Sequence, residues 1–222
     1  MRSIGGGLSN KASRELGPCA PSRGSRSDRN QARLARACAR LSWQYLAIRL
    51  KTLGRDRTIR FLDMNEGIEG PGMRLRDLLD EASVKVGLES VDKEECIEEL
   101  VDVLVRGGRI ADRAGALKAL RTRETMATTG IGKGVAVPHG KHDSIPKLVA
   151  VFGTSREGIE FDAIDGEPVH MVVLLLASSD QTGPHLRAMV EIARLVQVPG
   201  FYRKAVEART SAELLDLIDS EE

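Results

Sequence analysis

Cysteine and long apolar runs are both scarce in this 222-residue chain, and each scarcity excludes a class of protein. The three cysteines, Cys19, Cys38 and Cys96, lie far apart and form neither a disulfide framework nor a zinc-binding pattern. The longest apolar run, MVVLLLA, is far shorter than the roughly 18 residues that a membrane-spanning helix needs. The first ten residues lack the apolar core of a secretory signal. We therefore expect a cytoplasmic protein without a membrane span.

Acidic residues are scarce in the first part of the chain. Residues 1–60 hold 12 Arg and 2 Lys but only three acids, a net charge of +11, whereas residues 61–222 carry a net charge of −10. The first part is also rich in Ser and Gly and poor in apolar residues, so residues 1–72 are predicted to be a disordered extension. Three interpretations stay open: an arm that binds nucleic acid or an acidic surface, an organelle transit peptide, or translated non-coding sequence upstream of a true start at Met64 or Met73.

Residues 73–222 are expected to form one domain, and the Gly-rich stretch NEGIEGPGM (65–73) marks its boundary. Asp92, with Glu95 three residues later, predicts the capped start of a helix, and Asp112 opens a second helix that runs to about Glu124. Further helices are predicted at 183–197, 201–208 and 211–219, and strands at 84–88, 135–137, 148–154 and 169–177. This alternation indicates an α/β sandwich with helices on both sides of one sheet. No nucleic acid is expected to bind this acidic core domain.

The stretch TTGIGKGVAVPHGKH, residues 128–142, is the candidate site, and its first interpretation is a nucleotide-binding loop. A P-loop requires a hydroxyl residue after its lysine, but Lys133 is followed by Gly134. Pro138 and Gly140 also interrupt the region in which a helix would have to follow. The pattern therefore disfavours a nucleotide.

A metal site is the second interpretation. His139 and His142 lie three residues apart, and His185 could approach them in space. Such a spacing suits one metal ion mainly on a helix, which Pro138 and Gly140 disfavour here. Nearby acids are also few, so no metal ligand is assigned.

A phosphorylated histidine is the third interpretation. A neutral imidazole can accept a phosphoryl group, whose loose, anionic transition state needs positioning and positive charge. Pro138 should hold His139 at a strand end that faces solvent. His185 lies at a predicted helix N-terminus, which favours an anion, and Arg123 could supply a cation. Four glycines would allow the backbone to approach a phosphate closely: Gly130, Gly132, Gly134 and Gly140.

Three motifs in order carry a family resemblance: TRETMATTGIGKGVAVPHGK, EGIEFDAIDGEPVHMVVLLLA and DQTGPHLRAMVEIARLV. Over about residues 74–220 the chain resembles enzyme IIA of the bacterial phosphotransferase system (PTS). The resemblance is to the fructose/mannitol type, and most closely to its nitrogen-regulatory branch. It implies a mixed β-sheet flanked by helices on both sides, a three-layer sandwich. The extension 1–72 has no counterpart in that family.

The same resemblance implies roles for individual residues. His139 would be the phosphoryl acceptor, His185 the second active-site histidine, and Arg123 a source of positive charge. The wall of the phosphate site would comprise Thr129, Gly130 and Ile131, with Gly140 beside them. The implied donor is the phosphohistidine of HPr or an HPr-like carrier, and the family uses no metal and no soluble cofactor because the donor is a protein.

The resemblance thus implies a histidine phosphocarrier, and three outcomes stay open. The phosphoryl group could pass to a IIB protein and on to a sugar imported by a separate IIC transporter of the fructose or mannitol type. Alternatively, its presence could decide which regulatory target proteins bind, a use that TTGIGKG, PHGK and FDAIDGEPV favour. The third outcome is a binding module that kept the fold but lost transfer, and retention of both His139 and His185 argues against it.

Overall fold

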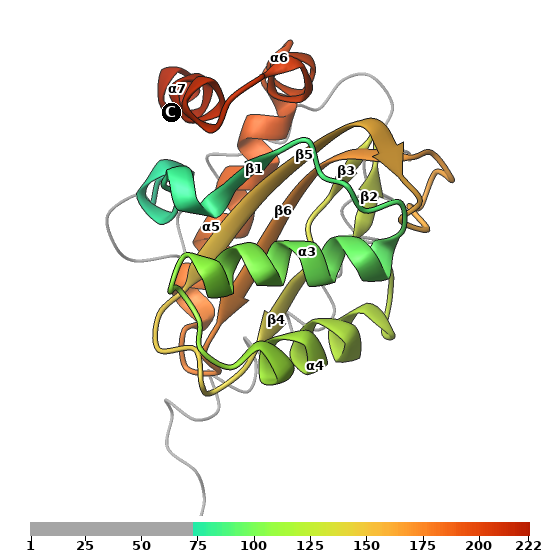
Figure 1. Ribbon diagram of the computed structural model, residues 1–222. Helices are drawn as coiled ribbons and strands as arrows, with labels where there is room; N and C mark the ends of the chain where they lie inside the picture. Colours follow the sequence, from blue (N-terminus) through green and yellow to red (C-terminus); the bar gives the residue numbers. More distant parts are fainter. Residues whose placement is uncertain (1–72) are drawn as a thin grey trace, which may run out of the picture. The chain divides into compact units, whose positions relative to one another are not determined.

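The computed structural model describes residues 73–222, and the extension predicted for residues 1–72 lies outside the described residues. One six-stranded mixed sheet runs through this part of the chain in the order β1-β5-β6-β3-β2, with β4 also paired to β6 (Figure 1). The strands are β1 (Val84–Val86), β2 (Gly130–Gly132), β3 (Val135–Ala136), β4 (His139–Lys141), β5 (Val149–Ile159) and β6 (Val169–Ala177).

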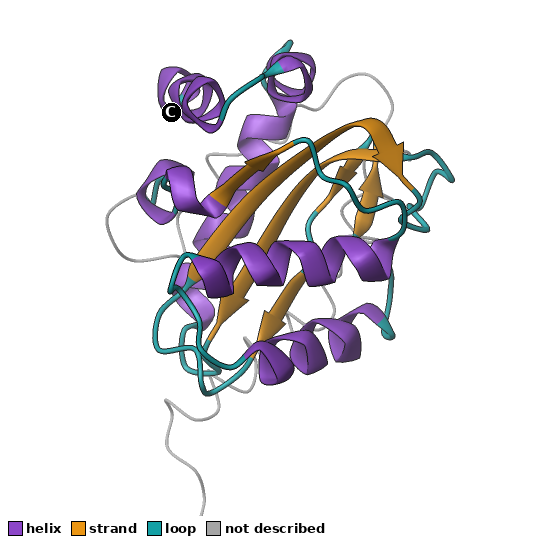
Figure 2. Cartoon of the chain, viewed as in Figure 1, coloured by secondary structure: helices purple, strands orange, loops and turns teal. Residues whose placement is uncertain are grey.

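Helices cover both faces of the sheet (Figure 2). One face carries α3 (Lys93–Arg106) and α4 (Arg113–Glu124), and the other carries α5 (Thr182–Gln197), α6 (Phe201–Glu207) and α7 (Ser211–Glu221). Two 3₁₀ turns, η2 (Leu75–Leu78) and η3 (Glu81–Ser83), precede β1. The predicted three-layer α/β sandwich with a mixed sheet is confirmed. No helix within residues 73–222 combines the length and apolar content that crossing a membrane requires.

Both predicted helix starts on the first face are capped as expected. The carboxylate of Asp92 accepts a 2.9 Å hydrogen bond from the backbone N–H of Glu95, and Asp112 accepts one of 2.8 Å from Gly115. These bonds satisfy N–H groups that have no partner inside the helix. The second cap fixes where α4 begins, and the last turn of this helix carries Arg123.

Strand β6 lies at the centre of the sheet and is buried on both faces. Leu174 and Leu176 pack into the core with α3 and α4, whereas Val173 and Leu175 pack into the core with α5, α6 and α7. All four side chains are fully buried. This arrangement explains the nearly continuous apolar run, since alternation disappears when both faces of a strand are covered.

Strands β3 and β4 form one interrupted strand along the edge of β6. Val135 pairs with Met171 in β3, and His139 pairs with Leu175 in β4, so the parallel register is unchanged across the gap. Pro138 lies in the gap and has no N–H to donate, but its carbonyl accepts a 2.9 Å bond from the backbone N–H of Leu175. His139 therefore begins a strand rather than ending one. Its side chain is half-buried, which corrects the expectation that it faces solvent.

The glycine-rich stretch before β3 forms a hairpin, which the sequence patterns did not predict. β2 pairs with β3 in antiparallel fashion, and the turn between them places Lys133 at φ 58° and Gly134 at φ 75°. Glycine adopts positive φ without strain, whereas Lys133 does so at a cost in energy. The hairpin ends the sheet beside the segment that carries His139.

Candidate active site

His139 has both ring nitrogens engaged. Nδ1 lies 2.9 Å from the backbone carbonyl oxygen of Val137, and Nε2 lies 3.1 Å from Nε of Arg123. An arginine N–H can only donate and a carbonyl can only accept, so Nδ1 carries the proton and Nε2 presents its lone pair. The contacts therefore select one neutral tautomer, and Nε2 is its nucleophilic atom.

Arg123 reaches this nitrogen from the last turn of α4. Its Nη1 donates a 3.0 Å hydrogen bond to the carbonyl of Ala127, so the guanidinium spans the turn after the helix. The side chain is half-buried, which limits its freedom and its screening by water. The predicted cation is thus in direct contact with the predicted acceptor.

His185 approaches His139 from the opposite helical layer. It lies in the first turn of α5, and the centroids of the two imidazole rings are 5.4 Å apart with a tilt of 51°. The side chain is buried, and its Nε2 has no hydrogen-bond partner in the described structure. A buried polar atom without a partner is costly, and an anion bound beside His139 would supply one.

Lys141 is a site residue that the sequence reasoning did not identify. It lies two positions after His139 on β4, and side chains two apart on a strand point to the same face. Its ammonium group donates a 2.7 Å hydrogen bond to Oγ1 of Thr182, the first residue of α5. The spacing in PHGK was the available signal, but the contact with α5 depends on the fold.

Burial lowers the pKa of both histidines. The pKa of His139 falls from 6.5 to about 4, because burial disfavours the charged ring and the charges of Arg123 and Lys141 add to the effect. The pKa of His185 falls to about 3, again mainly through burial, with His139 and the two cations contributing. Both rings are therefore neutral at pH 7, the state in which a histidine is a nucleophile.

Two of the predicted wall residues, Thr129 and Gly130, contact neighbouring parts of the protein. Thr129 is buried, and its backbone N–H and its hydroxyl both donate to the carboxylate of Glu124. A Cβ added to Gly130 would lie 2.8 Å from Cα of Ala163. The missing side chain at this glycine thus makes room for a neighbouring backbone.

The other two predicted wall residues, Gly140 and Ile131, also pack against the protein itself. A Cβ on Gly140 would lie 3.2 Å from the backbone of Ala119 and Leu120 in α4, so this glycine lets β4 and α4 approach closely. Ile131 is half-buried and packs against the core beneath α5, α6 and α7. The histidines and Arg123 are brought together, whereas these residues shape the scaffold around them.

His142 does not join the other two histidines. Its Nδ1 is 2.7 Å from the hydroxyl of Ser144 and 3.8 Å from the carboxylate of Asp112 at the start of α4. Within residues 73–222, no group of three His, Cys, Asp or Glu side chains is placed to hold a metal ion.

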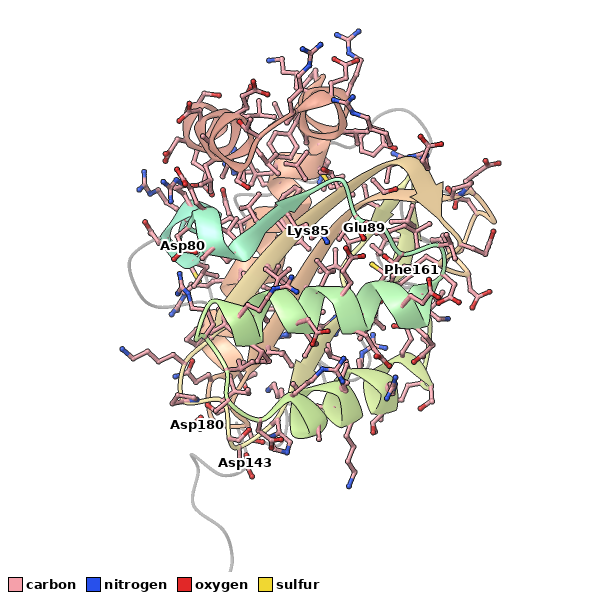
Figure 3. All side chains as sticks on the ribbon, viewed as in Figure 1. Asp80, Lys85, Glu89, Asp143, Phe161 and Asp180 are labelled. Carbon is pink, nitrogen blue, oxygen red and sulfur yellow. The ribbon has the colours of Figure 1, made fainter. Side chains whose placement is uncertain are left out.

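The loops at this end of the sheet are tied to each other. Asp143 follows β4 and Asp180 precedes α5, and Figure 3 shows both at the same end of the molecule. The hydroxyl of Ser179 donates a 2.8 Å hydrogen bond to Asp143, which links the two loops. The strand with His139 and the helix with His185 are therefore joined just beyond the site.

Comparison with solved structures places this fold in a known class. The nitrogen regulatory protein IIA-Ntr from Neisseria meningitidis matches with a TM-score of 0.61 and 27% identity, over 65% of this chain and 98% of that one. Enzyme IIA for mannitol from Escherichia coli, solved as a complex with phosphorylated enzyme IIB, matches with a TM-score of 0.56 and 22% identity, over 64% and 97% of the two chains. The fold is that of the enzyme IIA domains of phosphotransferase systems.

The family is established by the sequence match. Residues 77–221 match the family model described as phosphoenolpyruvate-dependent sugar phosphotransferase system, EIIA 2, and the chain belongs to this family of phosphotransferase domains. The fructose-specific EIIABC component of Bacillus subtilis (strain 168) is 32% identical over 147 residues, which are 66% of this chain and 23% of that protein. The chain thus matches less than a quarter of that relative's length. Sugar-specific and nitrogen-regulatory proteins are both among its relatives.

Proposed function

We propose that residues 73–222 form a histidine phosphocarrier domain in which Nε2 of His139 accepts a phosphoryl group. One observation carries the proposal: the Nδ1 proton is held by the carbonyl of Val137, while the Nε2 lone pair faces the guanidinium of Arg123. A neutral ring with a fixed nucleophilic nitrogen beside a cation is what transfer to histidine requires.

The transfer step conserves atoms and charge. The Nε2 lone pair of His139 attacks the phosphorus of a phosphohistidine on HPr or an HPr-like carrier. A new N–P bond forms and the donor N–P bond breaks. The donor ring, protonated on its other nitrogen, takes back the electron pair and leaves as a neutral imidazole. The Nδ1 proton stays in its hydrogen bond to the carbonyl of Val137 throughout, so the acceptor ring needs no external base.

Positive charge surrounds the place that the phosphoryl group would occupy. As the group reaches Nε2, the guanidinium of Arg123 can move its N–H bonds from the ring nitrogen to the phosphoryl oxygens. Lys141 and the N-terminal turn of α5 add charge from the other side, and His185 supplies a neutral donor. These groups together would stabilise an anion at this place.

The proposal extends to the fate of the phosphoryl group after transfer. We propose that the domain works in the cytoplasm and passes its phosphoryl group to a IIB protein or uses it as a regulatory signal. The mannitol enzyme IIA of Escherichia coli was solved with phosphorylated enzyme IIB, which supports a IIB-type acceptor. The nitrogen regulatory relative supports the signalling role. Phosphorylation adds about −1.5 to −2 charges to a domain that is already acidic, a change that binding partners can sense.

A phosphorylation assay tests the proposal directly. The full chain is incubated with phosphoenolpyruvate, enzyme I and HPr, and acid-labile phosphate is mapped on the wild type, His139→Ala and the control His142→Ala. We expect label on the wild type and the control and none on His139→Ala. Absence of label on the wild type, with HPr shown to be competent on another acceptor, would leave a binding module as the better description.

A further inference from the structure

Glu124 is a buried carboxylate for which the transfer step has no direct use. It is the last residue of α4, next to Arg123, and its side chain is only 6% exposed. One oxygen accepts a 3.0 Å bond from the backbone N–H of Thr129, and the other accepts a 2.7 Å bond from the Thr129 hydroxyl. A charge buried to this degree is costly unless it is paired and fully bonded, so the contacts call for an explanation.

The first connection from Glu124 leads to Nδ1 of His139. Glu124 holds Thr129 through its backbone N–H and its hydroxyl. The carbonyl of Thr129 accepts a 3.0 Å hydrogen bond from the backbone N–H of Val137. The carbonyl of Val137 in turn accepts the Nδ1 proton of His139 at 2.9 Å. The group that selects the tautomer is therefore fixed to a backbone segment that Glu124 anchors.

The second connection leads to Nε2. Glu124 closes the turn between α4 and Thr129, and the guanidinium of Arg123 spans the same turn through its bond to Ala127. The Nε–H of the same guanidinium donates to Nε2 of His139. Both nitrogens of the ring are thus held by segments that meet at one carboxylate.

Lys93 supplies the counter-charge from a different helix. Its ammonium lies 3.7 Å from the Glu124 carboxylate and 2.6 Å from that of Asp162, a residue held at φ 50°. The first turn of α3, the end of α4 and the loop after β5 are therefore joined at this point. Through Lys93, the Glu124 carboxylate is connected to α3 and to the loop after β5, and these connections can resist movement of the turn that Glu124 closes.

We propose that Glu124 is a positioning residue, which fixes the tautomer and orientation of His139 by anchoring Thr129 and the turn that carries Arg123. The inference rests on the proposed role of His139 as phosphoryl acceptor. Glu124 itself does not touch the reacting atoms. Its effect on the ring exists before any phosphoryl group arrives, so it is measurable in the resting protein.

The test compares variants of the full chain by two independent readouts. Glu124→Ala removes the anchor, and Glu98→Ala is the control, because Glu98 is a more exposed carboxylate that pairs with Arg113 and Arg121 on the helix surface. Long-range ¹H–¹⁵N NMR reports which nitrogen of His139 carries the proton. Phosphorylation by HPr reports transfer. We expect the wild type and Glu98→Ala to show the Nδ1–H form alone.

Glu124→Ala should show a mixture of tautomers and a phosphorylation rate reduced by about 10- to 100-fold, because misplacement of a reacting group by about 1 Å has effects of this size. Glu124→Asp should give a tautomer ratio and a phosphorylation rate between those of the wild type and Glu124→Ala. A folded Glu124→Ala protein with wild-type ring signals and rate would overturn the proposal. If that variant does not fold, Thr129→Val decides by the same criteria, since it removes only the hydroxyl bond to Glu124. A changed tautomer in a protein whose wild type accepts no phosphate would refute the carrier function and leave the positioning role standing.

Discussion

The ammonium group of Lys141 donates a hydrogen bond to the hydroxyl of Thr182 across 2.7 Å. Lys141 belongs to the strand that carries His139, and Thr182 begins the helix that carries His185. One side-chain contact therefore connects the two elements whose histidine rings lie 5.4 Å apart. It also holds a cation near the N-terminal end of α5, where the helix dipole favours an anion.

Removing the Lys141 charge should weaken phosphoryl transfer without unfolding the domain. The side chain is exposed, so Lys141→Met loses little burial, whereas the cation beside the phosphoryl group disappears. We expect the phosphorylation rate to fall by about tenfold, in line with about 1.4 kcal/mol of lost charge stabilisation. Thr182→Val keeps the Lys141 cation but removes its hydrogen-bond partner, so it should reduce the rate by less than Lys141→Met does. Lys118→Met on α4 is the matched control, and an equal loss there would refute a specific role for Lys141.

Arg123→Met should have a larger effect, because the guanidinium contacts Nε2 of His139 directly. We expect the rate to fall by about 10² to 10³, the usual cost of removing one preorganised charge-stabilising donor. Arg121→Met is the control on the same helix, since Arg121 pairs with Glu94 and Glu98 on α3. The measurement is single-turnover transfer from phosphorylated HPr. Equal rates for Arg121→Met and Arg123→Met would contradict the assigned contact.

The two histidines should make the domain less stable as the pH falls below about 6.5. In the unfolded chain their imidazoles bind protons near the ordinary value of 6.5, whereas the folded-state pKa is about 4 for His139 and about 3 for His185. Between these limits the unfolded state holds more protons, so the free energy of unfolding decreases as the pH decreases. Above about pH 8 the rings are neutral in both states, so they contribute no further pH dependence.

Urea unfolding at several pH values checks this sign. The wild type and His185→Gln are compared between pH 7.5 and pH 4.5, because the carboxylates shared by both proteins cancel in the difference. We expect the wild type to lose more stability than the variant across this range. Identical pH slopes would show that His185 titrates normally in the folded protein.

Gly130→Ala should destabilise the fold. The added methyl group would lie 2.8 Å from Cα of Ala163, and a backbone atom cannot move aside without disturbing its strand or loop. We expect a loss of about 1 to 3 kcal/mol in the free energy of unfolding, as for other overpacked sites. Gly183→Ala is the control, because nothing lies within 4 Å of its added Cβ. Calorimetry of both variants decides, and equal melting temperatures would contradict the packing role of Gly130.

The sequence was most informative where a signal was local. The cap at Asp92 needs only a residue three positions later, and the run at β6 needs only its own composition, so both were predicted correctly. Gly130 was different, because its role depends on Ala163, a residue 33 positions away that no local pattern connects to it. A run of glycines suits a phosphate loop and a tight hairpin equally well, and only the packing distinguishes the two.

The site shows the same division. His139, His185 and Arg123 were predicted from motifs, and the structure brings their side chains together, although their roles stay predictions until transfer is measured. The half-buried state of His139 was missed, because it depends on the helical layers that cover the sheet. Lys141 was missed because its contact with Thr182 joins residues 41 positions apart.

The unbroken register of β3 and β4 has a consequence for how this protein can change over evolutionary time. The segment from Val135 to Lys141 keeps step with β6 through Pro138, so the count of residues, and not only their identity, decides which face His139 occupies. Inserting or deleting a single residue there would turn the ring toward α4. Gly140 faces α4 now, and a side chain at its position would press against the backbone of that helix. Relatives that have a histidine at this position should therefore tolerate substitutions between the hairpin and the histidine far more readily than any change in length.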